Sequence, residues 1–325
     1  MNITPIPVPS ISFTDPTPAN GTITTQKYAY INTTIINYSN TTAFIDWNNS
    51  LVGWWRFNNE IGENSTFFRD WSSWGNNGTC SGTACPVSMS GMFGNALSFD
   101  GVNDYLNAGN SSSLNVTDAT TVEAWIYPRA DYVGYAAHPI SKWSSTTDAT
   151  MVLYYFGTTS GANRTVRFYA NRGGTWNAIS ESYKVELNKW YHIALSYNST
   201  KGGQLYVNGV PIGPLTGSGK LASNTQPLRI GGGSADYFNG TIDEVRIHNR
   251  ALSPDEIKAS YDAGTYRLYR NFTNLTEDVY NYRAYVQNSY GIVNQTETRI
   301  LNITTPPPPV LCNDSCGFTV NYIIN

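Results

Sequence analysis

The sequence has no apolar run of the roughly 18 residues that a membrane-spanning helix needs, and it has few charged residues. Charged residues make up 13% of its 325 positions and the net charge is −3, so no basic excess is present to bind nucleic acid or anionic lipid. The opening residues, Met1-Asn2-Ile3-Thr4, lack the basic side chains that begin a signal peptide. We therefore expect a mature product or an excised piece, with no membrane span and no nucleic-acid partner.

Motifs of common hydrolases are also missing. The sequence contains no Gly-x-Ser-x-Gly motif and no His-Glu-x-x-His motif. His138, His192 and His248 are scattered and belong to no motif, so each is expected to be structural rather than a ligand. Asp243 and Glu244 are adjacent, and adjacent side chains on a strand point to opposite faces. They are therefore not expected to act as a facing acid and base.

Aromatic and small polar residues dominate the composition. Aromatic residues make up 14% of the chain, with 23 Tyr and 9 Trp, while Gly, Asn, Ser and Thr separate short apolar runs. This composition favours an all-β protein whose polar surface consists of amides and hydroxyls. At roughly 100 to 200 residues per domain, the length predicts two domains.

The N-glycosylation sequon, Asn-x-Ser/Thr, is over-represented. Eighteen sequons occur, whereas the composition by itself predicts about seven. The predicted glycosylation sites are Asn20, Asn32, Asn37, Asn40, Asn64, Asn77, Asn110, Asn115, Asn163, Asn198, Asn239, Asn271, Asn274, Asn294 and Asn302. An Asn/Thr-rich surface would also produce sequons by composition, and that alternative stays open. The excess favours a glycosylated extracellular protein.

Four cysteines fall into two close pairs, Cys80 with Cys85 and Cys312 with Cys316. This spacing suits two local disulfides in an oxidising compartment. A four-cysteine metal site is the alternative, although zinc sites usually have the tighter Cys-x-x-Cys spacing. The cysteines thus also favour a secreted or cell-surface location.

Between residues 51 and 264, apolar residues alternate with polar ones at short intervals, as in strands with one buried face. The expected core-facing residues are Trp55, Phe57, Leu97, Phe99, Val122, Ala124, Ile126, Met151, Leu153, Tyr155, Val166, Phe168, Ile193, Leu195, Tyr197, Leu205, Val207, Leu228 and Ile230. Asn208-Gly209 fits a tight hairpin turn, because both residues tolerate positive φ.

A late strand followed by a capped helix is predicted from residue 238 to 262. Ile242, Val245 and Ile247 lie among polar residues, as on a strand with one buried face. Ser253 then suits a helix N-cap, with Pro254 at the first helical position and Glu256 at the third.

Six motifs in order give the chain a family resemblance. They are Gly53-Trp54-Trp55-Arg56-Phe57, Phe93-Gly94-Asn95-Ala96-Leu97-Ser98-Phe99-Asp100-Gly101, Glu123-Ala124-Trp125-Ile126, Trp190-Tyr191-His192-Ile193-Ala194-Leu195, Leu205-Tyr206-Val207-Asn208-Gly209 and the stretch from Phe238 to Ile257. The chain resembles the laminin-G-like, concanavalin A-like jelly-roll family over about residues 51 to 264. The resemblance implies a double-sheet sandwich.

The two ends of the chain look like halves of a second sandwich. Three short alternating stretches, 28 to 32, 34 to 38 and 44 to 46, are too few strands to close a core, and the strands that would complete it follow residue 265. The later segment, with Tyr280 as a corner tyrosine, resembles immunoglobulin-like and fibronectin-type-III domains. We expect residues 10 to 50 and 265 to 305 to form one discontinuous immunoglobulin-like sandwich, with the jelly roll inserted in one of its loops.

The termini are expected to be extended. Residues 1 to 9 carry alternating prolines and form a linker, and residues 306 to 325 form a polyproline spacer with a strand-like tail. The tail either begins a further domain or completes a sheet in another copy of the chain.

The family resemblance implies a structural calcium ion. Related domains hold calcium through a carboxylate on the late strand, matched here by Asp243, and through oxygens of an early loop, matched by Asp70 and Asn76. The alternative is that Asp70 and Asn76 organise an Asx-type turn and that Asp243 caps a neighbouring loop.

Carbohydrate binding needs exposed aromatic rings beside amides and hydroxyls. Tyr132, Tyr135, Trp143, Trp176 and Tyr237 lie in loops that could supply them, although packing of these rings is the alternative. Glycosidases of the resembling fold carry a Glu-x-Asp-x-Glu type pattern, and none is present here.

The predicted function is a non-enzymatic extracellular module for adhesion, glycan recognition or surface assembly. Its expected partners are carbohydrate, a surface protein or copies of itself. A structural subunit of a surface filament or layer is the alternative, and a glucanase-type glycosidase is a third possibility.

Overall fold

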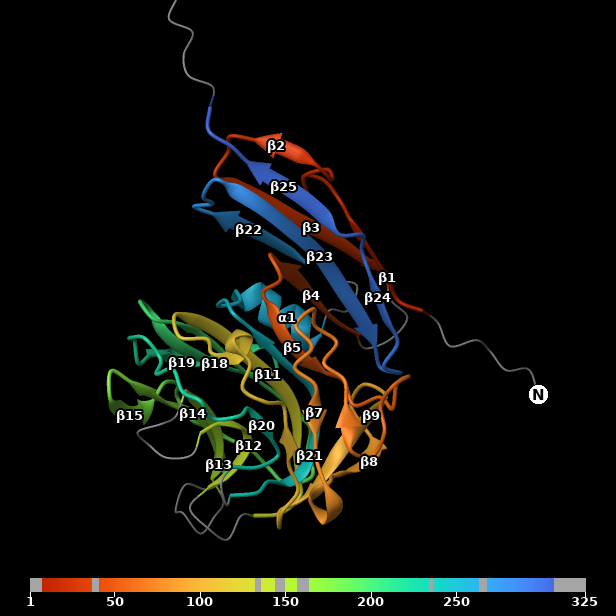
Figure 1. Cartoon of the computed structure of the whole chain (residues 1–325), viewed down its shortest axis with the longest axis vertical. Coiled ribbons are helices and arrows are strands. Elements are labelled where there is room, and N and C mark those ends of the chain that lie inside the picture. The colour runs from red at the N-terminus through yellow and green to blue at the C-terminus, as the bar shows by residue number, and fades with distance from the viewer. Residues whose placement is uncertain are drawn as a thin grey trace, which may run out of the picture.

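The computed structural model describes residues 8–36, 41–131, 136–143, 150–156, 164–233, 236–262 and 268–306. In this part of the chain nearly all regular structure is β, arranged in four sheets with one α-helix, α1 (Pro254–Tyr261), and two short 3-10 turns, Gly82–Ala84 and Ser112–Leu114. Figure 1 shows two bodies with α1 between them. We call the larger body the central sandwich and the smaller one the terminal sandwich.

The central sandwich consists of two sheets. The β13 sheet has the strand order β15-β14-β13-β12-β20-β10-β7-β6, with β16 also paired to β14. Its strands are β6 (Phe67–Phe68), β7 (Gly78–Thr79), β10 (Leu106–Asn107), β12 (Ala137–Lys142), β13 (Met151–Phe156), β14 (Thr165–Arg172), β15 (Thr175–Ala178), β16 (Tyr183–Lys184) and β20 (Arg229–Ile230).

The β11 sheet has the order β19-β18-β17-β11-β21-β9-β8, with β5 also paired to β21. Its strands are β5 (Leu51–Trp55), β8 (Val87–Ser90), β9 (Asn95–Asp100), β11 (Ala119–Pro128), β17 (Tyr191–Asn198), β18 (Gly202–Val207), β19 (Val210–Thr216) and β21 (Asn239–His248).

The core of the central sandwich lies between these two sheets. All nineteen residues that the alternation predicts as core-facing belong to one buried hydrophobic cluster, so this part of the prediction is confirmed. The hairpin between β18 and β19 is also confirmed, because Asn208 and Gly209 both have positive φ, of 51° and 74°. The alternation succeeds because each sheet buries one face and every second residue points to it.

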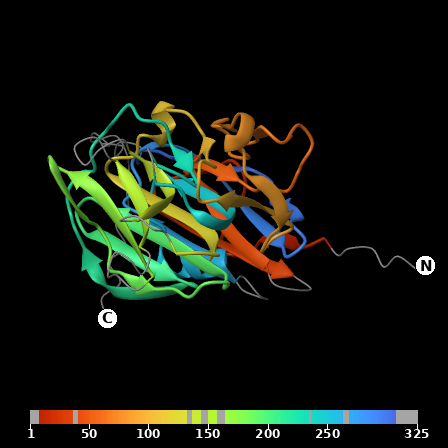
Figure 2. The ribbon, with the colours of Figure 1, turned by 90° about the horizontal axis from the view of Figure 1, so that it is seen from below.

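The terminal sandwich joins strands from both ends of the chain. One sheet has the order β1-β3-β22, and the other has the order β2-β25-β23-β24 with β4 also paired to β23. The strands are β1 (Ser10–Phe13), β2 (Thr22–Thr24), β3 (Tyr28–Ile36), β4 (Thr41–Trp47), β22 (Tyr269–Thr273), β23 (Asp278–Asn288), β24 (Val293–Gln295) and β25 (Arg299–Ile303). In Figure 1 the red N-terminal strands lie among the blue C-terminal ones, and Figure 2 shows this from below.

Aromatic stacking holds the core of the terminal sandwich together. The ring of Trp47 stacks on Phe272 at 4.0 Å and lies 5.4 Å from Tyr280 and 5.5 Å from Tyr282, between ring centroids. The hydroxyl of Tyr280 accepts a hydrogen bond from the backbone N–H of Thr276 at 3.1 Å, which is the corner arrangement predicted for it. The assignment of this sandwich to the immunoglobulin-like class stays a prediction.

One detail of the N-terminal prediction is wrong. Residues 28 to 36 form the single strand β3, without the break expected between the first two alternating stretches. Ala29, Ile31 and Ile35 are buried, whereas Tyr28 and Tyr30 are exposed. The strand stays continuous because β1 pairs with its second half and β22 with its first half.

Helix α1 lies between the two sandwiches. Its predicted capping box is confirmed: Ser253 Oγ accepts from the N–H of Glu256, and Glu256 Oε2 accepts from the N–H of Ser253. Ile257 packs on residues of the central sandwich, whereas Ala259 belongs to the core cluster of the terminal sandwich. The helix therefore contributes apolar contacts to both bodies.

A β-bulge in β21 corrects the prediction for Asp243 and Glu244. In the pairing with β11, Trp125 faces Asp243 and Glu123 faces Arg246, so β21 contains one extra residue. Glu244 has a positive φ of 50°, and Ile242 and Val245 both belong to the core cluster. Asp243 and Glu244 therefore both point away from the core, to the face that α1 and the terminal sandwich cover.

Candidate functional site

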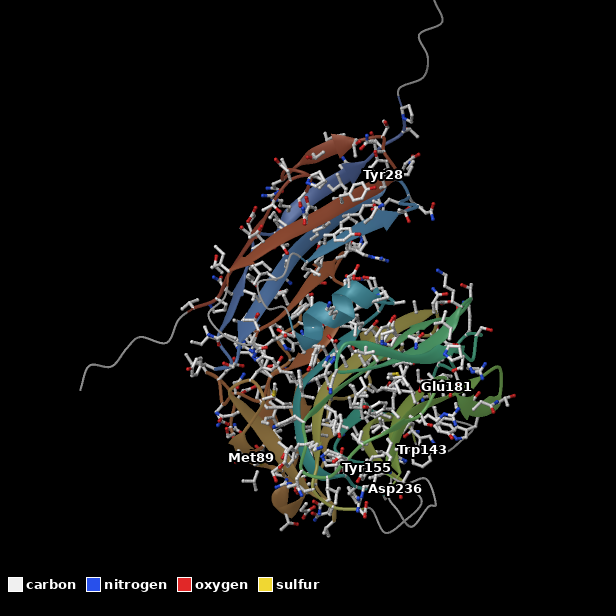
Figure 3. The ribbon with its side chains drawn as sticks, turned by 180° about the vertical axis from the view of Figure 1, so that it is seen from behind. Tyr28, Met89, Trp143, Tyr155, Glu181 and Asp236 are labelled. Atoms are coloured by element: carbon white, nitrogen blue, oxygen red, sulfur yellow. A yellow bond between two sulfur atoms is a disulfide. The ribbon has the colours of Figure 1, made fainter. Side chains whose placement is uncertain are left out.

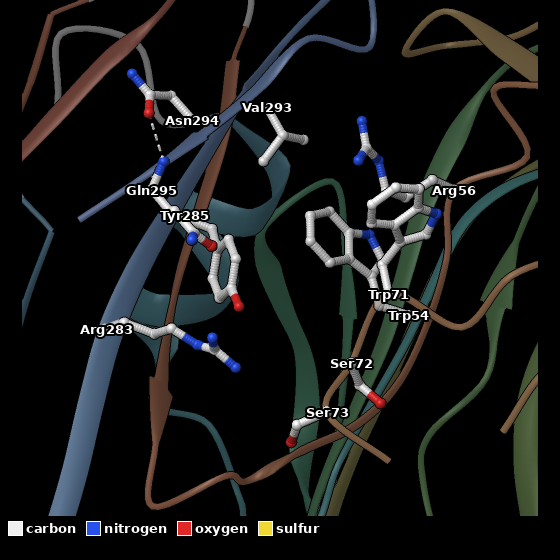
Figure 4. A pocket seen from close by; sticks show the side chains of 10 residues that line it. All are labelled: Trp54, Arg56, Trp71, Ser72, Ser73, Arg283, Tyr285, Val293, Asn294 and Gln295. Atoms are coloured by element: carbon white, nitrogen blue, oxygen red, sulfur yellow. Dashed lines mark hydrogen bonds between the residues drawn. The ribbon is translucent and has the colours of Figure 1, made fainter. Parts of the chain in front are cut away.

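A cleft of about 490 Å³ lies where the two sandwiches meet. We call it the junction cleft. Its lining residues are Trp54, Arg56, Trp71, Ser72 and Ser73 from the central sandwich and Arg283, Tyr285, Val293, Asn294 and Gln295 from the terminal sandwich. Figure 4 shows Tyr285 and Arg283 on one side of the space and Trp71, Trp54 and Arg56 on the other. The volume is within the about 300–1,000 Å³ range of small-molecule sites.

The aromatic residues of the cleft belong to one cluster that spans both bodies. Phe44 of β4 stacks on Tyr285 of β23 at 5.0 Å and contacts the edge of Trp54 of β5 at 5.1 Å. Trp71 and Val293 pack against this cluster from opposite sandwiches. Because Trp54, Tyr285 and Phe44 are almost fully buried, their rings are held in place by packing.

Arginines stack on these rings. The guanidinium of Arg56 lies 5.2 Å from the ring of Trp54 and 5.0 Å from that of Trp71, and Arg69 lies 4.3 Å from Trp71. On the other side, Arg283 lies 5.3 Å from the ring of Tyr285. Cation–π contacts of this kind orient a guanidinium while leaving its edge available for hydrogen bonds.

Each arginine that lines the cleft has a carboxylate partner behind it. Arg56 Nη2 lies 2.7 Å from Glu60 Oε1, and Arg283 Nη2 lies 3.5 Å from Asp46 Oδ2. Burial raises the pKa of Glu60 to about 7, with Arg56 and Arg69 acting to lower it and Glu63 and Glu244 acting to raise it. Burial also raises the pKa of Asp46, against the hydrogen bond from Leu51 and the charges of Arg283 and Arg250.

Polar groups complete the lining. Ser72 and Ser73 supply hydroxyls, and Asn294 and Gln295 supply amides. Asn294 is held in place at both ends, because its Nδ2 donates to the carbonyl of Pro9 at 3.0 Å and its Oδ1 accepts from the N–H of Gln295 at 2.8 Å. The cleft thus combines aromatic rings, hydroxyls, amides and guanidinium groups.

Beneath the cleft, buried polar side chains connect the two sandwiches. Trp54 Nε1 donates to one carboxylate oxygen of Glu244 at 2.8 Å, and Gln287 Nε2 donates to the other at 2.7 Å. Arg246 Nη2 donates to Thr42 Oγ1 at 3.1 Å. Because Glu244 and Arg246 belong to β21 whereas Gln287 and Thr42 belong to the terminal sandwich, these bonds fix the position of one body against the other.

The charges of this buried network influence one another. Burial raises the pKa of Glu244, and the charges of Arg246 and Arg56 act in the opposite direction. Burial also acts to raise the pKa of Glu123, but Arg246, 3.1 Å away, and His192 lower it to about 2. Glu123 is therefore ionised at neutral pH, although it is fully buried.

The aromatic residues predicted as ligand contacts lie elsewhere. Trp143 and Trp176 pack in one cluster with Val152 and Tyr169 on the β13 sheet, and Tyr237 lies 6.3 Å from Tyr105. In Figure 3 Trp143 lies at the end of the central sandwich remote from the terminal sandwich. Tyr132 and Tyr135 fall outside the described residues. None of the three described residues lines the junction cleft.

The residues predicted to bind calcium lie in two places. Asp70 is the centre of a turn: its Oδ1 accepts from the N–H of Trp54 and of Ser72, and its Oδ2 accepts from Ser72 Oγ and from the N–H of Asn76. Asn76 donates to the carbonyl of Val52.

Asp243 lies apart from this turn. Its Oδ2 accepts the backbone N–H groups of Met92 and Phe93, each at 2.9 Å, and burial raises its pKa well above the usual range. No group of three or more His, Cys, Asp or Glu that could hold a metal occurs within the described ranges. The calcium ion stays a prediction.

The structure confirms one of the two expected disulfides. Cys80 and Cys85 are bonded, whereas Cys312 and Cys316 fall outside the described residues, as does the rest of the tail from 310 to 325.

The predicted glycosylation sites differ in exposure. The sequons at Asn37, Asn40 and Asn163 fall outside the described residues. Among the described sequons, Asn20, Asn64, Asn110 and Asn274 are exposed. Asn32 is buried, and its amide donates to the carbonyl of Asp15, so the folded chain does not present it for glycosylation.

Sequence reasoning did not identify the cleft residues Arg56, Trp71, Arg283 and Tyr285. They come from two segments more than 200 positions apart, and neither segment carries a motif of its own for binding. The available signal was indirect: the paired Trp54-Trp55 at the start of the central sandwich lies beside the predicted connection between domains.

Comparison with known proteins supports the fold. Residues 100–258 match the model of the family described as the concanavalin A-like lectin/glucanases superfamily. Over 112 residues, 32% of the chain, the sequence is 31% identical to human adhesion G-protein coupled receptor D1, and it spans only 12% of that receptor's length.

Two solved structures resemble the chain at 18% identity. One is domain 4 of an extracellular GH43 arabinanase from Geobacillus stearothermophilus in complex with arabinotriose, with a TM-score of 0.50 over 65% of this chain and 98% of that domain. The other is the binding domain of Paraclostridial mosquitocidal protein 1, with a TM-score of 0.51 over 66% of this chain and 52% of that structure. At this identity they show the fold alone: the central sandwich is a concanavalin A-like jelly roll.

Proposed function

We propose that this chain is a non-enzymatic extracellular adhesion module that recognises carbohydrate in the junction cleft. The observation that carries this proposal is the lining of the cleft, where the half-buried Trp71 lies beside the hydroxyls of Ser72 and Ser73, and the buried rings of Trp54 and Tyr285 form part of the wall. Sugars bind through apolar ring faces and through many hydroxyl groups, so they need aromatic rings and polar groups together.

Three further findings support the extracellular adhesion role. The disulfide between Cys80 and Cys85 suits an oxidising compartment. The partial relative is an adhesion receptor, and one structural neighbour was determined with arabinotriose bound. Independently of this role, no helix in the described ranges is long and apolar enough to cross a membrane.

The domain organisation behind this proposal is a jelly roll, residues 51 to 264, inserted into an immunoglobulin-like sandwich made of residues 10 to 50 and 265 to 305. It is supported by the pairing of β3 with β22 and of β4 with β23. An inserted domain with two connections moves less than one on a single tether. The two walls of the cleft, which come from different sandwiches, would therefore stay in register.

Binding is tested with glycan-free protein on an array of oligosaccharides, because Asn294 lines the cleft and is itself a predicted glycosylation site. We expect Trp71→Ala to weaken binding about tenfold or more. The matched control is Trp74→Ala, which removes an exposed tryptophan of the same loop that does not line the cleft. Equal affinity of Trp71→Ala and wild type would exclude the cleft as the site.

The non-enzymatic part of the proposal rests on the side chains available. No Asp or Glu is among the residues that line the cleft in the described part of the chain, so a carboxyl pair for glycoside hydrolysis is lacking there. We expect a bound oligosaccharide to be recovered intact after prolonged incubation with the protein, as measured by chromatography. Cleavage products that disappear in a cleft variant would contradict this.

A further inference from the structure

The charge of the junction cleft is one-sided. Two arginines, Arg56 and Arg283, line it, a third, Arg69, stacks on Trp71 at its edge, and none of the ten lining residues is acidic. This contrasts with the chain as a whole, whose net charge is −3. A local cluster of guanidinium groups on an acidic protein favours a ligand that carries negative charge.

Arg283 has hydrogen-bonding capacity to spare. A guanidinium has five N–H donors, and among the described residues the one ion pair of Arg283 is with Asp46, at a long 3.5 Å. In Figure 4 its guanidinium points into the space between Tyr285 and Ser73, and its side chain is 24% exposed. The planar guanidinium can therefore bind a carboxylate by donating two parallel hydrogen bonds to it.

Arg56 is more constrained and contributes mainly charge. Its Nη2 donates to the carbonyl of Gly291 at 2.7 Å and pairs with Glu60, so part of the fork is already occupied. Burial keeps the pKa of Glu60 near 7, so at neutral pH the positive charge of Arg56 is only partly compensated by its partner. The potential on this wall of the cleft is positive in consequence.

We propose that the ligand of the junction cleft is an acidic saccharide whose carboxylate is bound by Arg283. This inference rests on the proposed function and names the class of sugar. The aromatic wall and the serine hydroxyls take the ring, while the guanidinium groups take the charge. The ion pair between Arg283 and Asp46 is long, at 3.5 Å, so guanidinium donors of Arg283 still face a partly dehydrated site. A carboxylate binds such donors more strongly than a neutral hydroxyl does, and this favours the acidic sugar.

The test uses paired ligands and the whole chain in glycan-free form. Oligosaccharides that contain glucuronate, galacturonate or sialate are each compared with the same oligosaccharide after reduction of the carboxyl group to an alcohol. We expect the acidic member of at least one pair to bind about tenfold or more tightly than its reduced counterpart, as measured by titration calorimetry. Affinity should fall as salt concentration rises.

The protein variants locate the effect at Arg283. Arg283→Gln is expected to lower the affinity for the acidic member by about tenfold more than the affinity for the reduced member, so that the preference is lost. Arg283→Lys keeps the charge but not the fork, so it should retain an intermediate preference. The control is Arg299→Gln on the adjacent strand β25, where the arginine is similarly exposed, at 21%, and also ion-paired but lies outside the cleft.

The outcomes separate the two proposals. Tight binding of neutral and acidic members alike, or a preference that survives in Arg283→Gln, would overturn the inference while leaving carbohydrate recognition intact. Binding of no saccharide in the set would overturn both. A preference for sulfated oligosaccharides over the carboxylated ones would assign the charge to a sulfate ester and refute the carboxylate.

Discussion

Replacing Glu244 should separate the contribution of hydrogen bonds from that of charge at the junction of the two sandwiches. Glu244 is fully buried and accepts from Trp54 Nε1 at 2.8 Å and from Gln287 Nε2 at 2.7 Å. Glu244→Ala would leave both donors without an acceptor. Each buried donor left unsatisfied costs about 1–3 kcal/mol, which gives about 2–6 kcal/mol for the pair.

Two further effects change the expected loss of unfolding free energy in Glu244→Ala. Burial already disfavours the carboxylate of Glu244, as its raised pKa shows, so removing the charge returns part of the loss. The lost side-chain volume adds a cavity term in the other direction. We therefore expect Glu244→Ala to lower the free energy of unfolding by about 3 kcal/mol.

Glu244→Gln is the matched control. Its amide oxygen can still accept from Trp54, and its amide nitrogen can donate to Gln287 if that side chain turns over. Gln287 Oε1 has no hydrogen-bond partner within the described residues, so the rotation sacrifices no existing bond. Arg246 keeps its ion pair with Glu123. We expect a loss below about 1 kcal/mol.

The assay is equilibrium unfolding in urea followed by tryptophan fluorescence, with the wild type and both variants under the same conditions. A value for Glu244→Ala within about 1 kcal/mol of wild type would refute the argument that these bonds hold the junction together. Equal destabilisation by Ala and Gln would show that charge, not hydrogen bonding, is the important property of Glu244.

Three further predictions concern single groups. Burial raises the pKa of Glu60 to about 7 in the folded protein, so the wild type loses stability as pH rises through 7 and this carboxyl group must ionise. Glu60→Gln lacks the ionisation, so its free energy of unfolding in urea titrations should rise relative to wild type between pH 5 and pH 8. The bond between Cys80 and Cys85 closes a short loop, so the double Cys→Ser variant should lose only about 1–3 kcal/mol and unfold at a modestly lower temperature in calorimetry. The calcium hypothesis predicts that a chelator lowers the melting temperature of wild type but not that of Asp243→Asn, and metal analysis of the purified protein checks it independently.

The core of the central sandwich follows from the sequence because strand periodicity is a local property. Residues such as Val122, Ala124 and Ile126 face the core whenever their strand lies in a sheet with one buried face, whichever strand is its neighbour. The same holds for the helix that begins at Ser253, since its capping box needs only four consecutive residues. The pairing between Cys80 and Cys85 was also predictable, because five positions of chain keep the two residues close.

The junction cleft was decided by the tertiary structure. Trp71 and Tyr285 approach one another only because β23 pairs with β4, which is followed directly by β5, the first strand of the central sandwich. The bulge at Glu244 leaves one trace in the sequence, the step of three residues between the apolar Ile242 and Val245, but this step does not show which residues the bulge brings together. The bulge turns a residue expected in the opposite direction toward Trp54 and Gln287. Local sequence patterns determine which face of a strand is apolar. Where the two sandwiches contact one another depends instead on pairing between residues far apart in the chain.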